Sequence, residues 1–518
     1  MILTPGEITL TRWEADVCIV GSGAGGAIAA AKIASSGRRV LLLEEGSRVQ
    51  QEDLNQDATR LVPLMYRRAG GLGTDDMSIR ILQGRVLGGS CTINWMTCLR
   101  TPDMVLDEWA NRFGLEEYRP GEMAPHFEAV EQRLSVHAIP EEHHNSQNRI
   151  ILVGARKLGV QAEASANNSV DCIGCGTCGL GCPYDAKQDM RLTYLADAQT
   201  HDTTILTGVR AERIHYLSPS QHRVEASILS DESSTIERKL EVTCTQVVVA
   251  ASAIGTPLLL QHSRLNGSSL LGKYLHLHPV TATAGIYEEI LDPTYGIPQS
   301  TVCEHYSNLN GEGYGFRLEV PDVEPFLAGV NFPGVGRSRR DGMRNMRRMG
   351  MIIALLRDGA DRRSNGEVCW RRGLNVQSGH LSISKVPSIR YRLSPTDREH
   401  LQQGMETAVA FHFAAGAREV LTLHNRHQTL TSPSQIPQLR NLASGPNQLS
   451  MFSAHPTGTA RMGKDRRFGV VDETMQMHHH PGIYVMDGSV LPTAPGVNPM
   501  ITILATVSRA LELGDLAS

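Results

Sequence analysis

The feature that most constrains the fold of this chain is a glycine-rich turn near its start. The apolar run Ala15–Val20 leads into the turn Gly21–Gly26, and the alanine-rich stretch Ala27–Ala34 follows it. The apolar run is typical of a buried parallel strand, and the alanine-rich stretch is long enough for a helix. A second apolar run, Arg39–Leu43, predicts the next strand. This order predicts a strand–helix–strand unit whose turn binds a dinucleotide.

The residues of this turn have separate expected roles. Gly21 permits the tight turn, Gly23 lets backbone amides approach a pyrophosphate, and Gly26 lets the helix pack against the strand. Ala24 belongs to the same turn, where the positive end of the helix favours phosphate. Glu44 lies 18 residues past Gly26, at the distance where an acid accepts hydrogen bonds from a ribose. The turn alone does not separate FAD from NAD.

Length and charge exclude several classes of protein. A chain of 518 residues exceeds what one hydrophobic core supports, so we expect two domains. The net charge of −4 gives no reason to expect nucleic acid as a partner. No apolar run reaches the roughly 18 residues of a membrane span, and residues 1–7 do not resemble a secretory signal. Ten cysteines are too few for a disulfide scaffold, so we expect a cytoplasmic protein with reduced thiols.

Further motifs lie along the chain in a fixed order. They are Gly84–Asn94, Ala250–Leu260, Ser453–Gly463, Gly482–Pro492 and Gly496–Leu504. Together with the glycine turn, they make the chain resemble the glucose–methanol–choline (GMC) flavoprotein oxidoreductases. The resemblance covers nearly the whole chain and is nearest the long-chain alcohol and sterol oxidase branch, which also carries a cysteine-rich loop.

The resemblance implies FAD as the cofactor and assigns residues to its parts. Gly21, Gly23, Gly26 and Glu44 would hold the ADP half, and Val209 would present backbone to the adenine. The remaining positions would contact the pyrophosphate, ribityl chain and flavin; they are Gly84, Gly89, Ser90, Asn94, Asp487, Gly488, Asn498 and Met500. Ile93 stands where some relatives tether the flavin through a histidine, so non-covalent FAD is expected.

The same resemblance assigns a catalytic pair. His455 occupies the position of the family's histidine, and Asn498 occupies a second position where relatives have His or Asn. A histidine near its ordinary pKa suits the removal of a hydroxyl proton, while an asparagine amide orients the hydroxyl. The expected reaction is oxidation of an alcohol to a carbonyl by hydride transfer to flavin N5. The expected substrate is an apolar alcohol; oxygen, another acceptor and a carrier protein remain open as electron acceptors.

The expected fold class is α/β, with a discontinuous Rossmann-like FAD-binding domain and a substrate domain. Residues 1–274, including a cysteine-rich loop at 165–190, would form the first part of the FAD-binding domain. Residues 275–438 would form the substrate domain, with a mostly antiparallel sheet and helices. Residues 439–518 would return to the FAD-binding domain and carry the catalytic pair.

A cysteine run inside that loop predicts a second redox site. Its spacing is C-x2-C-x2-C-x3-C-P, as in bacterial ferredoxins, and it consists of Cys172, Cys175, Cys178 and Cys182. An iron–sulfur cluster that relays electrons is the favoured interpretation, with zinc and unmetallated or disulfide-forming thiols as alternatives. Two other functions also stay open: a lyase of the same fold, and the flavin subunit of an electron-transfer complex.

A basic stretch at residues 337–349 carries six arginines. It could dock an acidic electron carrier, an anionic membrane surface or an acidic substrate, or it could be a solvated helix face. His278, in the run His276-Leu-His278-Pro279, receives no role from its sequence context.

Overall fold

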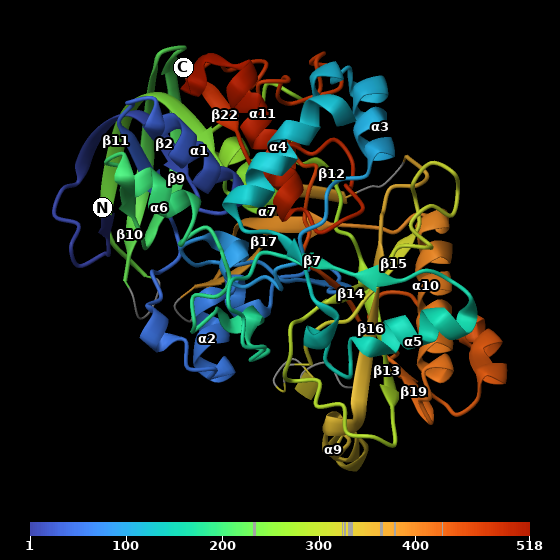
Figure 1. Cartoon of the computed structure of the whole chain (residues 1–518). Helices are drawn as coiled ribbons and strands as arrows, with labels where there is room; N and C mark the ends of the chain where they lie inside the picture. The colour runs from blue at the N-terminus through green and yellow to red at the C-terminus, as the bar shows by residue number, and fades with distance from the viewer. Residues whose placement is uncertain are drawn as a thin grey trace.

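Two large sheets organise the part of the chain that the structure describes (Figure 1). A computed structural model describes residues 1–517, except 231–234, 324, 326–327, 330–334, 363–365, 378–379 and 427. The strands of the first sheet come from both ends of the chain, and those of the second come mainly from its middle. Each sheet carries its own cluster of buried apolar side chains.

The first sheet contains the predicted strand–helix–strand unit. Strand β2 (Arg12–Val20) leads through α1 (Ala24–Ser35) to the parallel strand β3 (Val40–Leu43). Helix α1 approaches the sheet closely, because a Cβ atom added at Gly26 would lie only 1.9 Å from the carbonyl oxygen of Gly21. The sheet order is β1-β8-β3-β2-β11-β10-β9, and β22 also pairs with β11. The remaining bounds are β1 Ile2–Leu3, β8 Thr204–Leu206, β9 Val209–Ser218, β10 Gln221–Leu229, β11 Ile236–Val249 and β22 Ile483–Val485.

Helices from distant parts of the sequence cover this first sheet. Helix α11 (Met500–Leu513) packs against α1 and α4, and α6 (Tyr194–Thr200) packs against α1. Helix α7 (Ser252–His262) packs against β9, and α3 (Asp103–Phe113) packs against α4. Helix α4 spans Pro120–Arg133 and begins with a proline in its first turn, where no backbone donor is needed.

The second sheet is mostly antiparallel and runs in the order β20-β19-β13-β16-β15-β14-β6. One face of β13 and β16 is covered by α10 (Pro395–Ala414), which begins with a capping box at Ser394 and also packs against α5 (Arg149–Leu158) (Figure 1). Strand β21 pairs with β13 and also with β4, which comes from the start of the chain. The bounds are β4 Ile79–Ile81, β6 Glu163–Ala164, β13 Val280–Ile286, β14 Thr301–Cys303, β15 Phe316–Glu319, β16 Met349–Leu356, β19 Glu419–Thr422, β20 Thr429–Leu430 and β21 Met451–Ser453.

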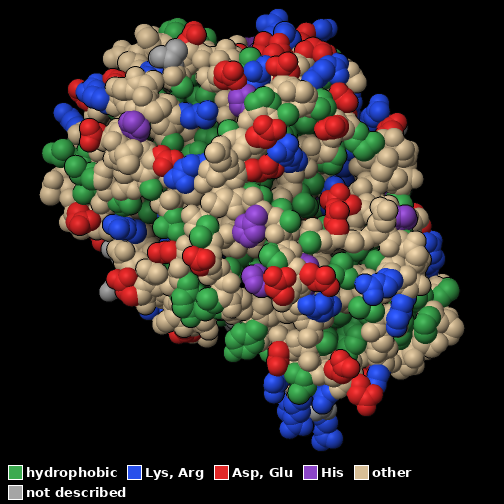
Figure 2. Space-filling view, in the orientation of Figure 1, with side chains coloured by type: hydrophobic (Ala, Val, Ile, Leu, Met, Phe, Trp, Pro, Cys, Tyr) green, Lys and Arg blue, Asp and Glu red, His purple; other side chains and the backbone are tan. Residues whose placement is uncertain are grey.

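Smaller elements complete the described chain. They are α2 (Ala58–Met65), α9 (Arg337–Arg344), the pair β5 (His137–Ala138) and β7 (Ala166–Asn167), and the small sheet of β12 (Lys273–Leu275), β17 (Gly366–Gln377) and β18 (His380–Arg390). Figure 2 shows basic side chains gathered at the end of the molecule where α9 lies. Among the described residues, none of the helices has the length and apolar character needed to cross a bilayer.

Candidate active site

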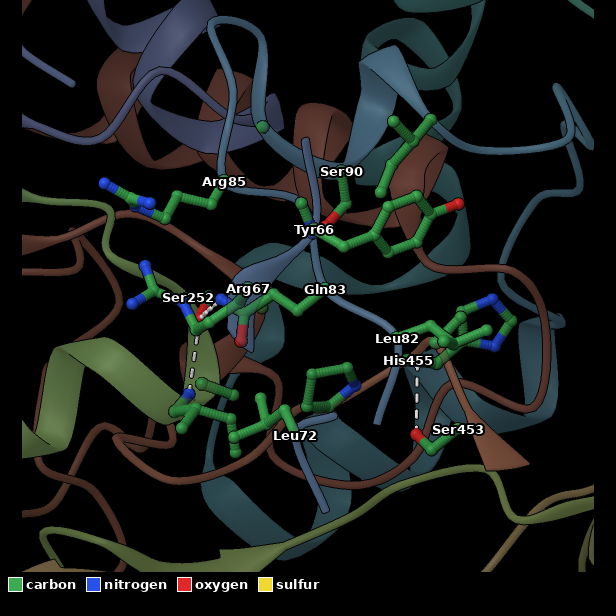
Figure 3. A pocket seen from close by; sticks show the side chains of 18 of the residues that line it. Tyr66, Arg67, Leu72, Leu82, Gln83, Arg85, Ser90, Ser252, Ser453 and His455 are labelled. Atoms are coloured by element: carbon green, nitrogen blue, oxygen red, sulfur yellow. Dashed lines mark hydrogen bonds between the residues drawn. The ribbon is translucent and has the colours of Figure 1, made fainter. Parts of the chain in front are cut away.

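A cavity of about 1310 Å³ extends from the glycine turn of the first sheet to the face of the second (Figure 3). It exceeds the roughly 300–1,000 Å³ that is usual for a small-molecule site, so it has room for a dinucleotide and a substrate together. Most of the residues predicted for the cofactor and for catalysis line it. They are Gly21, Gly23, Ala24, Glu44, Gly84, Gly89, Ser90, Asn94, Val209, His455, Asp487, Gly488, Asn498 and Met500.

Gly26 lies outside the cavity lining, where it lets α1 pack against the turn. Gly23 caps the start of α1 and has no side chain to occupy the free amides of the first turn. Gly23 and Ala24 line the cavity, so the positive end of the helix is open to an anionic group there. The predicted phosphate position therefore coincides with an uncapped helix start.

Glu44 is buried, and both of its carboxylate oxygens hold backbone in place. One oxygen accepts from the amide and the hydroxyl of Ser22, at 3.0 and 2.6 Å, and the other accepts from the Gly46 amide at 2.7 Å. Burial raises the pKa of Glu44, and these three donors counteract the increase. A ribose contact would therefore have to share a carboxylate that already fixes the turn.

Glu45, next along the chain, also lines the cavity and was not singled out by the sequence motifs. Its carboxylate lies 2.7 Å from Nη2 of Arg67 and 3.4 Å from Nε of Arg85. Burial would raise the pKa of Glu45, but the positive charges of Arg67 and Arg85 outweigh it and lower that pKa. Figure 3 shows both arginines at the same end of the cavity. Arg85 lies within the motif Gly84–Asn94, but no motif indicates Arg67, because its contact with Glu45 joins separate segments.

The segment Gly84–Asn94 packs directly on the glycine turn. The Gly88 amide donates to the Ser22 hydroxyl at 2.9 Å, and a Cβ atom added at Gly89 would lie 2.8 Å from Cα of Gly23. The backbone at Gly89 has φ of +58°, a conformation that favours glycine. This close approach of two backbones explains why glycine is needed at position 89.

Lys187 holds the same segment from the other side and is fully buried. Its ammonium donates to the carbonyl oxygens of Thr92, Asn94 and Cys178, at 2.7, 2.9 and 2.9 Å. Burial lowers the pKa of Lys187, while Cys178 and Asp189 nearby act to raise it. One buried charge therefore joins the cysteine loop to the wall of the cavity.

Asp487 connects the late motif to the start of α7. Its carboxylate accepts from the Ser252 amide at 2.8 Å, the Thr256 hydroxyl at 2.5 Å and the Ser489 amide at 2.8 Å. Gln83 donates to the Ser252 hydroxyl at 2.6 Å, and Figure 3 shows this bond within the cavity. Asp487 therefore fixes the wall at this position through backbone contacts.

His455 and Asn498 line the same cavity. The His455 amide donates to the Ser453 hydroxyl at 3.3 Å (Figure 3), and burial lowers the pKa of the imidazole to about 4. Asn498 is 8% exposed, and its Oδ1 is buried with no hydrogen-bond partner among the described residues. A buried acceptor without a donor is uncommon in native proteins and marks a position for a ligand donor.

His278 received no role from its sequence context, but it contacts His455 directly. The two Nδ1 atoms lie 3.2 Å apart, and the rings meet edge to face with centroids 5.3 Å apart. His278 is fully buried, with φ of +45°, and its amide donates to Asp358 at 3.1 Å. A residue other than glycine in this conformation carries strain, which the surrounding contacts must hold.

The proton positions on this histidine pair follow from one backbone donor. The Gly496 amide donates to Nε2 of His278 at 3.0 Å, so that nitrogen is an acceptor. Neutral His278 therefore carries its proton on Nδ1 and donates it to Nδ1 of His455. Neutral His455 then holds its own proton on Nε2 and offers an N–H group. Nothing in the local sequence reveals this arrangement, because Gly496 lies 218 residues beyond His278.

A buried carboxyl group lies behind Asn498. Glu319 is fully buried and accepts from Nε2 of Gln299 at 2.5 Å. Burial raises the pKa of Glu319 to about 7, although the charge of Arg317 and a hydrogen bond with Asn498 act to lower it. Glu319 is therefore a titratable group close to the position expected for the alcohol.

The four cysteines surround a small enclosed hollow rather than a metal site. All of them are free thiols, and together they line a hollow of about 10 Å³, roughly the space of one water molecule. Burial raises the pKa of Cys172 and Cys178, which favours the neutral thiols over the thiolates that bind metals. Over the described parts of the chain, which include all four, no group of three or more His, Cys, Asp or Glu side chains could hold a metal ion. The metal role predicted for Cys172, Cys175, Cys178 and Cys182 therefore has no support in this arrangement.

Comparison with known proteins identifies the class to which this site belongs. Two family models described as GMC oxidoreductase match residues 62–280 and 375–506, and a model of an NAD(P)-binding Rossmann-like domain matches residues 19–50. The chain belongs to the GMC oxidoreductase family. It is a flavoprotein oxidoreductase, and the predicted family and α/β fold class are confirmed.

Individual relatives agree with this assignment. An uncharacterized GMC-type oxidoreductase of Mycobacterium tuberculosis is 32% identical, with 99% of this chain and 77% of that protein covered. A long-chain-alcohol oxidase of Arabidopsis thaliana is 31% identical, with 96% of this chain and 66% of that protein covered. The crystal structure of a pyridoxine 4-oxidase from Mesorhizobium loti has the same fold, with a TM-score of 0.69, 18% identity, and 96% and 98% of the two chains covered.

Proposed function

We propose that the protein oxidises an apolar alcohol to a carbonyl compound with non-covalently bound FAD. The observation that carries the proposal is the buried Oδ1 of Asn498, which has no donor and lines the same cavity as His455. A hydroxyl group supplies the missing donor. When bound, FAD supplies the acceptor of the hydride that leaves the alcohol carbon.

The chain has a suitable site for each part of this cofactor. The uncapped start of α1 and the close-packed backbones at Gly23 and Gly89 suit a pyrophosphate. Glu44 and Glu45 are the acids within reach of a ribose, and Val209 lines the cavity at the same end. Asn94 and Met500 line the part that we assign to the flavin. Ile93 offers no nucleophile for a covalent link, so we expect denaturation to release the FAD intact.

His455 is the proposed base and Asn498 the residue that orients the hydroxyl. In the resting arrangement His455 carries its proton on Nε2, so this nitrogen cannot accept the hydroxyl proton. His455 can accept the hydroxyl proton on Nε2 only as the other neutral tautomer, which carries its own proton on Nδ1. That tautomer moves the His278 proton onto Nε2, where it faces the Gly496 amide. Leaving a buried donor unpaired costs about 1–3 kcal/mol. The competent tautomer would then be a minor form, roughly 1–10% of the population, which is accessible during turnover.

The proton and the hydride balance in this scheme. The alcohol loses a hydride from carbon and a proton from its hydroxyl, and the carbonyl bond forms between those two atoms. The hydroxyl has one proton, which Oδ1 of Asn498 accepts as a hydrogen bond when the alcohol binds and which Nε2 of His455 receives in the reaction. The Asn498 amide holds the oxygen beside the imidazole before this transfer.

An anaerobic screen of alcohols tests the proposal. We expect primary or secondary apolar alcohols to bleach the flavin absorbance without oxygen, and His455→Gln to abolish rapid bleaching while retaining FAD. Bleaching by no alcohol in the presence of full FAD occupancy would overturn the proposal and favour a lyase. Admission of oxygen after bleaching then shows whether oxygen serves as the electron acceptor.

The iron–sulfur relay remains a prediction from the cysteine spacing. It would require the hollow between the four thiols to widen and the thiols to ionise, and no step of the proposed reaction depends on it. Iron and acid-labile sulfide analysis of protein purified without air tests it. Full flavin content with no iron would end the relay hypothesis.

A further inference from the structure

The cavity continues beyond the catalytic pair along one face of the second sheet. On β13 the residues that line it are Val280, Ala282 and Ala284, which alternate along the strand. Alternate residues of a strand point to the same face. The intervening Thr281 and Thr283 do not line the cavity, and α10 packs against β13. The cavity face of β13 is therefore apolar and carries small side chains at two of three positions.

Neighbouring strands extend the same apolar surface. Each of the three β13 residues is paired across the sheet with a cavity-lining residue of β16; the pairs are Val280–Leu355, Ala282–Ile353 and Ala284–Met351. On the other side, Ala284 is paired with Leu421 of β19, which also lines the cavity. These residues of β13, β16 and β19 form an apolar trough in the floor of the cavity. The alanines of β13 lie along its middle, and larger branched or flexible side chains lie on both sides.

The trough has a fixed beginning and a fixed end. It begins at the reaction site, because His278, two residues before Val280, contacts His455 and because Val280 is paired with Phe452 of β21. It ends at a buried cluster that contains Ile286, with Met343 packed against it; the other members of this cluster, Ala284, Met349 and Leu421, form the last part of the cavity wall. Ile286 and Met343 do not line the cavity. Position along β13 therefore measures distance from the catalytic pair.

The length of this floor corresponds to a hydrocarbon chain. The four steps along the strand from Val280 to Ala284 span about 14 Å at roughly 3.4 Å per residue. Carbon–carbon bonds of about 1.5 Å give an extended hydrocarbon chain a rise of roughly 1.25 Å per carbon. The floor past Val280 therefore matches about eleven carbons. Two residues of strand correspond to about five carbons.

We propose that β13 is the chain-length selector of this enzyme. The substrate is an unbranched long-chain alcohol that lies along the strand, with its hydroxyl at His455 and Asn498, and Ala282 and Ala284 provide the space for its chain. This inference rests on the proposed alcohol oxidation, and it adds the shape of the substrate and the residues that limit its length.

Two variants test the selector at two depths. Ala282→Phe and Ala284→Phe each fill the trough at a different distance from the catalytic pair. Measured as kcat/KM over a series of 1-alkanols, the wild type should gain about four-fold per added carbon until the trough is full, since each buried methylene contributes roughly that factor. Both variants should keep the wild-type activity on the shortest alcohols. Their cut-offs should differ by about five carbons, with the Ala282→Phe cut-off the shorter.

A matched control is available on the same strand. Thr283 lies between the two alanines but outside the cavity lining, and its hydroxyl is buried without a partner among the described residues. Thr283→Val should leave the chain-length profile unchanged. If a phenylalanine variant fails to retain flavin, Ala282→Val and Ala284→Val give smaller shifts of the cut-off in the same order.

Binding measurements separate failure of the selector from failure of the proposed function. Calorimetric titration with 1-alkanols of enzyme whose flavin has already been reduced, in the absence of oxygen, reports affinity without reaction. In one outcome, affinity depends on chain length and both substitutions shorten the cut-off in the stated order, but no alcohol bleaches the flavin. This outcome would reject alcohol oxidation and keep the selector. Bleaching with equal cut-offs in both variants, or with no dependence on chain length in the wild type, would overturn the selector and keep the oxidation.

Discussion

Replacement of Lys187 by methionine tests whether one buried charge holds the cofactor cavity together. The ammonium donates to three carbonyl oxygens, at Thr92, Asn94 and Cys178. Hydrogen bonds to charged groups contribute roughly 1.5–3 kcal/mol each, so three contribute roughly 4–9 kcal/mol. Burying an ammonium costs several kcal/mol and offsets part of this sum, so we expect a net loss of about 3 kcal/mol. Methionine has similar length and leaves the Thr92 and Asn94 carbonyls without this donor, while the Cys178 carbonyl keeps the Gly181 amide at 3.2 Å.

The assay combines flavin content with urea unfolding. Because Asn94 lines the cavity, we expect Lys187→Met to lose FAD on gel filtration and to unfold at lower urea concentration. Lys464→Met is the matched control, since that ammonium is half exposed and makes a surface ion pair with Glu117 at 2.9 Å. Such pairs contribute about 0–1 kcal/mol. Full FAD retention by Lys187→Met, with a free energy of unfolding within about 1 kcal/mol of the control, would refute this reasoning.

Three further outcomes follow from the site. Because burial lowers the pKa of His455 to about 4, the acid limb of kcat/KM should lie near pH 4 rather than near 6.5; a limb that stays near 6.5 would show that another group limits the rate. Asn498→Leu removes the amide that holds the substrate oxygen and should reduce kcat by about 10²–10³-fold in stopped-flow reduction, whereas a loss below ten-fold would contradict its assigned role. The pKa of Glu319 is raised to about 7, so its contribution to stability is present below pH 4.5 and lost as pH rises through 7. Glu319→Gln should remove about 3 kcal/mol of that pH dependence in urea titrations, and an unchanged dependence would exclude Glu319 as its source.

The parts of the site that the sequence predicted are those set by local backbone geometry. The turn at Gly21–Gly26 follows from a strand, a helix and close backbone packing between them, all within one short segment. The same is true of Gly89, whose positive φ and contact with Gly23 leave no room for a side chain. Such requirements fix the residue type and are therefore visible in the sequence.

The parts that were missed depend on contacts between distant segments. The role of His278 requires Gly496 to reach its ring, and the role of Arg67 requires Glu45 on another loop. The cysteine run shows the opposite case, because its spacing matches a cluster motif while the folded loop leaves only a small hollow between the thiols. Spacing determines which side chains can meet, and the surrounding structure determines how far apart they are held.

The pairing of late strands with early ones has a consequence for synthesis of the protein. Strand β4, near residue 80, finds its partner β21 only near residue 452, and β11 receives β22 only near residue 484. A chain emerging from the ribosome can fold its first strand–helix–strand unit early, but the second sheet stays incomplete until residue 453 has been translated, and the first until residue 485. The chain can therefore bind the cofactor only late in translation. Removal of the final forty residues would leave the flavin without an enclosing wall.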